Sequence, residues 1–271
     1  MTSNTLEHRC YEPKTLLYQR PLLLLHGAWH GAWCWDNAAH DFAARGFAVH
    51  TLSLRGHGRS SMPRYFNTIG LNHYIDDLLA LVATLKPAPI VVGHSLGGYI
   101  LQHAVMQHPL PAAVLLASMP QTGPLGFTLR TMRTQPSVLL RAFATADGYS
   151  FVRTPALAKY LFLRDNASAA QTQAIHSQLG SESLRVLLDA LIHKPKPSHI
   201  KTPIMVIAAE RDRVFTLAKQ RSLANAYQAP LIIVPQAAHD LMFDPAWPLV
   251  ADAIEGWASR HQTSLFDQPT P

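Results

Sequence analysis

The chain has 271 residues, 48% hydrophobic and 15% charged, with a formal net charge of +6. This size suits one α/β domain with an insertion. The sequence has no run of 18 apolar residues, so no membrane span is predicted. The first 20 residues lack the apolar segment of a signal peptide, and Cys10 and Cys34 are too few for a disulfide framework. We therefore expect a cytoplasmic protein without a nucleic-acid-binding module.

The first 120 residues predict strands that alternate with helices. Residues 1–11 are polar and predict a loose segment, while residues 15–18 could form an early edge strand. Apolar runs predict buried strands at residues 22–26, 47–52, 89–92 and 112–117. Helices are expected from Asp36 to a stop at Gly46, and over residues 71–86 and 96–107. Alternation of this kind favours a mostly parallel, doubly wound sheet with helices on both faces.

The pattern changes between residues 121 and 202. Strand signals become rare, and short helical patterns cover residues 128–144, 156–164, 169–179 and 182–192. An insertion of about eighty residues is too long for an ordinary loop, so we expect a helical cap after the strand at 112–117. The core then comprises residues 1–120 and 203–271. Its second part predicts strands at 203–208 and 231–234 and helices at 215–227 and 247–260.

The net positive charge is concentrated in this insertion. Residues 121–202 contain ten Lys or Arg and four Asp or Glu, whereas the rest of the chain is balanced. We favour a solvated helical surface as the explanation. Attraction of an anionic substrate or a membrane surface is the alternative.

A Gly-x-Ser-x-Gly motif lies between the strand at 89–92 and the helix at 96–107. It places Ser95 between Gly93 and Gly97. On a strand–turn–helix unit this motif forms a nucleophile elbow, in which a strained turn exposes the serine hydroxyl above the sheet edge. A glycine-rich turn without chemistry is the alternative. The flanking strand and helix favour the nucleophile.

A serine hydroxyl needs a base, and chain position selects one of the fifteen histidines. His239 follows the last buried strand and so lies at the carboxyl edge of the sheet, like Ser95. The base needs a carboxylate to orient it, and Asp212 follows another strand at the same edge. Glu210 is the rival for this role. Asp244 is less suitable and could instead help to start the last helix.

Two backbone N–H groups are expected to stabilise an oxyanion. Leu96, next to the serine, supplies one, and Ala28, after the strand at 22–26, supplies the other. His26 more plausibly shapes this loop than takes part in chemistry. His26 and His30 lack further partners at metal-ligand spacing, so no metal site is expected.

These motifs together resemble the α/β-hydrolase superfamily. The resemblance rests on His-Gly-Ala at 26–28, Arg-Gly-His-Gly-Arg-Ser at 55–60, Gly-His-Ser-Leu-Gly-Gly at 93–98, Asp212, and Ala-His-Asp at 238–240. It covers most of the chain outside the cap, and it implies the α/β-hydrolase fold.

Residues 26–35 are similar to the branch that contains plant methyl-ester esterases and hydroxynitrile lyases. Lyases of that branch commonly have Thr at the position of Gly27 and Lys at the position of Asp240. Both departures point to ester hydrolysis. Dehalogenases and epoxide hydrolases of the superfamily use an aspartate nucleophile, so Ser95 argues against them.

The resemblance implies a carboxylesterase or lipase-like serine hydrolase with a catalytic triad of Ser95, Asp212 and His239 and an acyl-enzyme intermediate, acting on small or medium apolar esters. No cofactor or metal is implied, and we expect a monomer or homodimer. Candidate substrate-binding residues are Trp29, Trp33, Tyr99, Met119, Phe127 and Phe143. Alternatives are hydrolysis of a carbon–carbon bond, lactone or thioester, hydroxynitrile lyase activity, and a non-catalytic small-molecule receptor.

Overall fold

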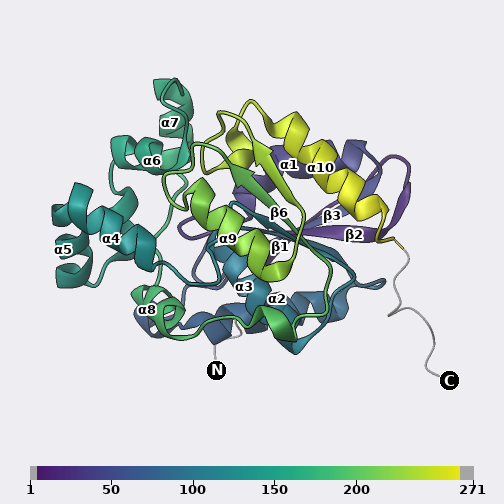
Figure 1. The fold of residues 1–271 in the computed structure, drawn as a ribbon, viewed down its shortest axis with the longest axis horizontal. Helices are drawn as coiled ribbons and strands as arrows, with labels where there is room; N and C mark the ends of the chain where they lie inside the picture. Colours follow the sequence, from purple (N-terminus) through teal and green to yellow (C-terminus); the bar gives the residue numbers. More distant parts are fainter. Residues whose placement is uncertain (1–4, 263–271) are drawn as a thin grey trace.

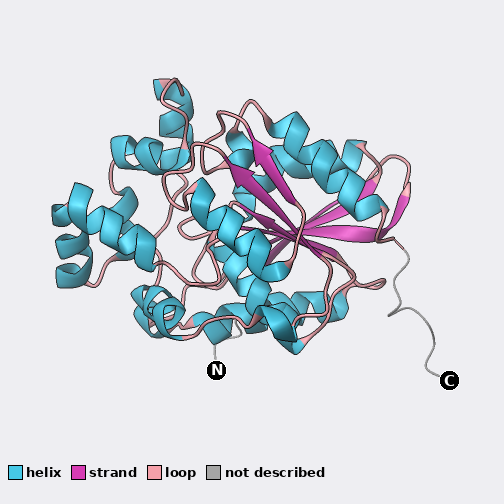
Figure 2. Cartoon of the chain, in the orientation of Figure 1, coloured by secondary structure: helices cyan, strands magenta, loops and turns pink. Residues whose placement is uncertain are grey.

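A seven-stranded sheet covered by helices on both faces forms the centre of the protein (Figures 1 and 2). The computed structural model describes residues 5–262. The spatial order is β1-β3-β2-β4-β5-β6-β7, and all neighbouring strands are parallel except β1 and β3. The predicted mostly parallel α/β sheet is confirmed. The strands are β1 (Glu7–Tyr11), β2 (Tyr18–Leu25), β3 (Phe47–Ser53), β4 (Ile90–His94), β5 (Ala113–Leu116), β6 (Ile204–Ala209) and β7 (Leu231–Val234).

Alternate side chains of the central strand β2 fill two separate cores. Leu22 and Leu24 pack in one core and Leu23 and Leu25 in the other, because successive side chains of a strand point to opposite faces. The first core is covered by α1 (Asp36–Ala44) and α10 (Trp247–Ser259). The second lies under α2 (Leu71–Thr84), α3 (Leu96–Gln107) and α9 (Leu217–Tyr227) (Figure 1). Burial on both faces explains why β2 is a continuous leucine run.

In the sequence, five α-helices come between β5 and β6. They lie together at one end of the sheet (Figure 1). The helix expected at 128–144 is two helices, because Pro136 cannot continue a helix and disfavours the helical conformation at Gln135. No helix within residues 5–262 combines the length and apolar character needed to cross a bilayer. The inserted helices are α4 (Leu125–Thr134), α5 (Pro136–Thr145), α6 (Pro155–Phe162), α7 (Ala169–His176) and α8 (Leu184–Ile192).

The prediction for the N-terminal segment was wrong. Strand β1 forms within the supposedly loose residues 1–11, and residues 15–17 are not a strand, since β2 begins at Tyr18. Polar partners across the sheet stabilise β1. The Glu7 carboxylate accepts hydrogen bonds from Ser53 Oγ (2.6 Å) and from Arg59 N (2.8 Å). An edge strand of this kind lacks the apolar alternation by which strands are predicted.

The turn between β4 and α3 packs directly against the end of β2. A Cβ atom added at Gly97 would collide with the His26 carbonyl oxygen and lie 2.8 Å from the Leu25 carbonyl oxygen. A Cβ added at Gly93 would lie 2.7 Å from the Gly97 carbonyl oxygen. Backbone atoms form both contacts, so no side-chain rotation could relieve them.

We predict that Gly97→Ala lowers the free energy of unfolding by about 1–3 kcal/mol, the usual cost of forcing an atom into packed space. Gly256→Ala is the matched control, because its added Cβ meets nothing within 4 Å in the middle of α10. It should raise the free energy of unfolding by about 0.5–1 kcal/mol. Urea unfolding measures both. Equal effects of the two substitutions would contradict the tight-turn explanation.

Candidate active site

Ser95 occupies a strained turn at the carboxyl end of β4. Its φ and ψ angles are +53° and −118°, a conformation that residues with a Cβ rarely adopt. The Ser95 N–H donates to the Leu116 carbonyl (3.0 Å), and its own carbonyl accepts from Met119 N (3.0 Å). Both bonds tie the turn to β5 and to the segment that follows it. This geometry is that of a nucleophile elbow.

The hydroxyl of Ser95 meets the imidazole of His239. His239 Nε2 lies 2.9 Å from Ser95 Oγ, although the two residues are 144 positions apart. Strand β7 ends beside β6, and the loop that follows carries His239 back over the sheet edge. His239 is 1% exposed and Ser95 6%, so both groups are shielded from bulk water.

Asp212 orients this imidazole. Its Oδ2 lies 2.8 Å from His239 Nδ1, and its Oδ1 accepts from Val214 N (2.7 Å) and Phe215 N (2.8 Å). A carboxylate can only accept, so Nδ1 carries the proton and Nε2 presents a lone pair to Ser95. This tautomer is the one that a general base requires.

The two rival carboxylates have other partners. Glu210 accepts from Gln236 N (2.8 Å). Asp244 pairs with Arg164 (2.7 Å) and accepts from Ala246 N (2.8 Å) just before α10, in agreement with the helix-starting role considered for it.

Opposing influences act on the pKa of His239. Burial disfavours the imidazolium, but the charge and hydrogen bond of Asp212, followed by the charge of Asp240, outweigh it, so the pKa is raised above 6.5. The site is therefore arranged to stabilise a proton on His239 once one has been transferred to it.

The two segments expected to supply the oxyanion N–H groups both approach the serine. Leu96 is the first residue of α3, where an N–H has no acceptor within the helix. The loop after β2 passes so close to the elbow that a Cβ added at Gly27 would lie 2.7 Å from Ser95 Cβ. His26 holds this loop, since its Nε2 accepts from Leu54 N (3.0 Å) and its Nδ1 donates to the Gly27 carbonyl (2.7 Å). The oxyanion role of Ala28 and Leu96 stays a prediction.

A buried carboxylate behind His239 was not anticipated. Asp240 Oδ2 lies 3.1 Å from His30 Nε2, and Asp240 Oδ1 lies 3.7 Å from His94 Nε2. His94 Nε2 also donates to the His239 carbonyl (3.1 Å), while burial and the neighbouring His239 lower the pKa of His94 to about 3. Despite burial, these histidines lower the pKa of Asp240. No spacing rule links positions 30, 94 and 240, so the sequence carried no signal for this cluster.

The donor atoms of His94, His239 and Asp240 lie within 4.8 Å of one another. They are nevertheless poor metal ligands. Both ring nitrogens of His239 already contact Asp212 and Ser95, and Nε2 of His94 donates to a carbonyl.

Five aromatic side chains, which we call the aromatic shell, form a connected series of rings that begins and ends at the imidazole. The Phe162 ring stacks on His239 with centroids 6.0 Å apart, and Phe215 meets it edge-on at 5.8 Å. Ring contacts continue from Phe162 through Trp29, Phe151 and Phe127 to Phe215. Three members come from the inserted segment: Phe127, Phe151 and Phe162. Of the five, Trp29 and Phe127 were predicted from the sequence. The other three lacked a motif.

The remaining candidate substrate residues lie outside the aromatic shell. Tyr99 is fully buried and donates to the His193 carbonyl (2.6 Å). Trp33 stacks between His30 and Phe243. Met119 is buried beside the Ser95 carbonyl, and Phe143 is 56% exposed at an apolar groove of the inserted helices that Phe127 and Phe151 also line.

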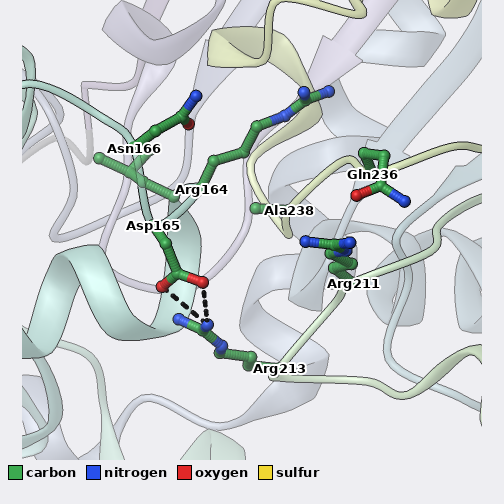
Figure 3. A pocket seen from close by; sticks show the side chains of 8 residues that line it. Arg164, Asp165, Asn166, Arg211, Arg213, Gln236 and Ala238 are labelled. Atoms are coloured by element: carbon green, nitrogen blue, oxygen red, sulfur yellow. Dashed lines mark hydrogen bonds and ion pairs between the residues drawn. The ribbon is translucent and has the colours of Figure 1, made fainter.

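A polar cavity of about 220 Å³ lies nearby, between the segment after α6 and the loops after β6 and β7 (Figure 3). Arg164, Arg211 and Arg213 contribute to its lining, and Arg213 pairs with Asp165 at 2.8 Å. Neither Ser95 nor His239 lines this cavity. Its charged walls make it unsuitable for an apolar group.

Comparison with known proteins agrees with this geometry. The sequence model of the alpha/beta hydrolase family matches residues 22–253, which is most of the chain. The protein belongs to the alpha/beta hydrolase family. The resemblance inferred from the motifs is thereby confirmed.

Two relatives in sequence and one solved structure show which enzymes this alpha/beta hydrolase is similar to. A monoacylglycerol lipase of Mycolicibacterium smegmatis is 24% identical and covers 89% of this chain and 88% of its own. A pheophorbidase of Raphanus sativus is 26% identical, with 84% and 90% covered. The solved structure of a methylesterase from Arabidopsis shares the fold with a TM-score of 0.67, 21% identity and coverage of 88% and 99%.

We predict that the His239 imidazole titrates above pH 6.5 and that Asp212→Asn lowers its pKa, because the substitution removes the largest stabilising charge. NMR titration measures this, with His239→Gln used to assign the signal. Glu210→Gln is the control and should leave the pKa unchanged. If it lowered the pKa as Asp212→Asn does, the assignment of the orienting carboxylate would be wrong.

Proposed function

We propose that this alpha/beta hydrolase is a serine hydrolase that cleaves carboxylic esters through an acyl-enzyme intermediate. The contact chain from Ser95 through His239 to Asp212 is the observation that carries the proposal. It joins a nucleophile, a base and an orienting carboxylate in the order that acyl transfer requires.

The proposed reaction has two halves. Ser95 Oγ attacks the ester carbonyl carbon as His239 accepts its proton, while the N–H groups of Ala28 and Leu96 stabilise the oxyanion. Collapse of the tetrahedral intermediate expels the alcohol, which takes the proton from His239. Water then attacks the acyl-enzyme with His239 again as base, and the free acid leaves. Neither half requires a metal or cofactor.

The inserted segment is proposed to act as a cap that forms the acyl site. We divide the chain into a core, residues 1–120 and 203–271, and a cap, residues 121–202. The cap supplies three of the five rings of the aromatic shell, and its Phe162 contacts His239, which favours small or medium apolar acyl groups. Polar contacts hold it to the core, including Tyr74 Oη to Glu182 (2.8 Å) and Arg164 to Asp244 (2.7 Å).

The names of the relatives and the chemistry around His239 support ester cleavage over its rivals. The relatives are named as a lipase, a pheophorbidase and a methylesterase. Position 240 carries a buried carboxylate paired with His30, where the lyases of the similar branch have a lysine. A small-molecule receptor would need the pocket but not the base in contact with the serine.

Two expectations drawn from the sequence remain predictions. A cytoplasmic location is supported by Cys10 and Cys34, which form no disulfide. A monomer or homodimer is expected in solution.

We predict that Ser95→Ala reduces hydrolysis of p-nitrophenyl esters at least about 1,000-fold and abolishes labelling by a fluorophosphonate probe, because the nucleophile is removed. Ser177→Ala, on the exposed end of α7, is the control and should behave as wild type. Hydrolysis that survived in Ser95→Ala would refute the proposal. A folded wild-type protein that neither labels nor turns over any ester, lactone, thioester or mandelonitrile would favour the receptor alternative.

A second prediction concerns the acyl site. Phe151→Ala should lower kcat/KM for a medium-chain ester roughly 10-fold and change that for an acetate ester much less, because apolar contacts of this kind contribute about 1–3 kcal/mol. Leu140→Ala, at a 73% exposed side chain of α5, is the control and should leave the preference intact. An equal change of preference in Leu140→Ala would show that the effect does not come from the aromatic shell.

A further inference from the structure

Three side chains of the types that bind metal ions converge at the edge of the sheet, on strands other than the one that leads into Ser95. His8 and Cys10 lie on β1, and His50 lies on β3. The antiparallel register places Cys10 directly opposite His50, and His8 is two residues from Cys10, so all three point to the same face. We call this set the edge cluster.

The donor atoms of the edge cluster are close together. His8 Nε2 lies 2.9 Å from His50 Nδ1, and Cys10 Sγ lies 3.0 Å from His50 Nδ1 and 3.6 Å from His8 Nε2. Tetrahedral zinc with ordinary bond lengths separates two nitrogen ligands by about 3.3 Å and nitrogen from sulfur by about 3.6 Å. Side-chain shifts of roughly half an ångström would bring all three atoms into that arrangement.

Hydrogen bonding alone does not account for this convergence. A neutral His50 Nδ1 carries either one proton or one lone pair, so it can form one good hydrogen bond. It nevertheless has two close neighbours, His8 Nε2 and Cys10 Sγ. A metal ion bound by all three atoms would satisfy each of them at once.

The local electrostatics suit a cation. The charge of the Glu12 carboxylate acts on the Cys10 thiol. That carboxylate adds negative charge beside the cluster.

We propose that His8, Cys10 and His50 form a metal-binding site for a thiolate- and imidazole-preferring ion, with Zn²⁺ as the ion best matched to this donor set. Binding displaces one proton from the Cys10 thiol, and water or Glu12 completes the coordination. The ion would join β1 to β3, the antiparallel pair at the edge of the sheet. The proposal is independent of the ester-cleaving function.

Sequence spacing did not reveal the edge cluster. Cys10 and His50 are 40 positions apart, and the sheet register brings them together. A His-x-Cys pair alone has no specific meaning as a motif.

The full-length protein, treated with a chelator and then dialysed, is titrated with Co²⁺ as a spectroscopic substitute for zinc. We expect one equivalent to produce the thiolate-to-cobalt charge-transfer absorption, and Zn²⁺ to displace it. Cys10→Ser should abolish this absorption. His8→Ala and His50→Ala should each weaken binding by more than about 100-fold, since even indirect supports of metal sites are worth 10–100-fold.

Matched controls separate the site from background binding by the other histidines. Cys34→Ala, at the second cysteine, and His199→Ala, at an exposed histidine elsewhere, should retain both the absorption and the affinity. Zn²⁺ should raise the midpoint of thermal unfolding of wild type but not of Cys10→Ser, because ligand binding stabilises only the folded site. Absence of the thiolate absorption in wild type, or its survival in Cys10→Ser, would overturn the proposal.

Discussion

The site depends on the strained conformation of Ser95. Only a turn with a positive φ can place its hydroxyl above the end of β4, and the turn persists because the structure around it leaves no alternative. Gly93 and Gly97 allow the backbone to contact itself and the end of β2, while the turn donates a hydrogen bond to β5 and accepts one from Met119 in the segment after β5. Every other group is arranged around this hydroxyl.

The sheet then aligns groups that the chain separates widely. Strands β4, β6 and β7 run parallel and end at one edge, so the loops after them carry the nucleophile, the carboxylate and the base to the same place. Backbone bonds between the last two loops, such as Arg211 N to the Ala237 carbonyl (2.9 Å), hold Asp212 near His239. The side chains need little movement to meet, which is how a rigid scaffold reduces the entropic cost of reaction.

The buried charge near His239 and the charges of the inserted segment have different kinds of partner. Behind His239, Asp240 is buried and compensated by histidines rather than by arginine or lysine. On the outside, some of the ten basic residues of segment 121–202 are paired, as in Arg164 with Asp244 and Arg185 with Asp189 (2.6 Å). The inner side instead presents aromatic rings to the base. A basic, solvated exterior over an apolar interior explains how one segment can be both highly charged and suited to apolar substrates.

The sequence by itself determined the parallel strands, the elbow at Ser95, and the placement of His239 and of an acidic residue after β6, because each follows an apolar strand run and parallel strands share their carboxyl edge. It did not determine strand β1, the division of the helix at Pro136, the choice of Asp212 over Glu210, the partners of Asp240, or the presence of Phe151, Phe162 and Phe215 in the aromatic shell. It also gave no sign that His8, Cys10 and His50 meet. These features depend on contacts between residues far apart in the chain, and only the tertiary structure decided them, since local periodicity carries no information about which distant side chains become neighbours.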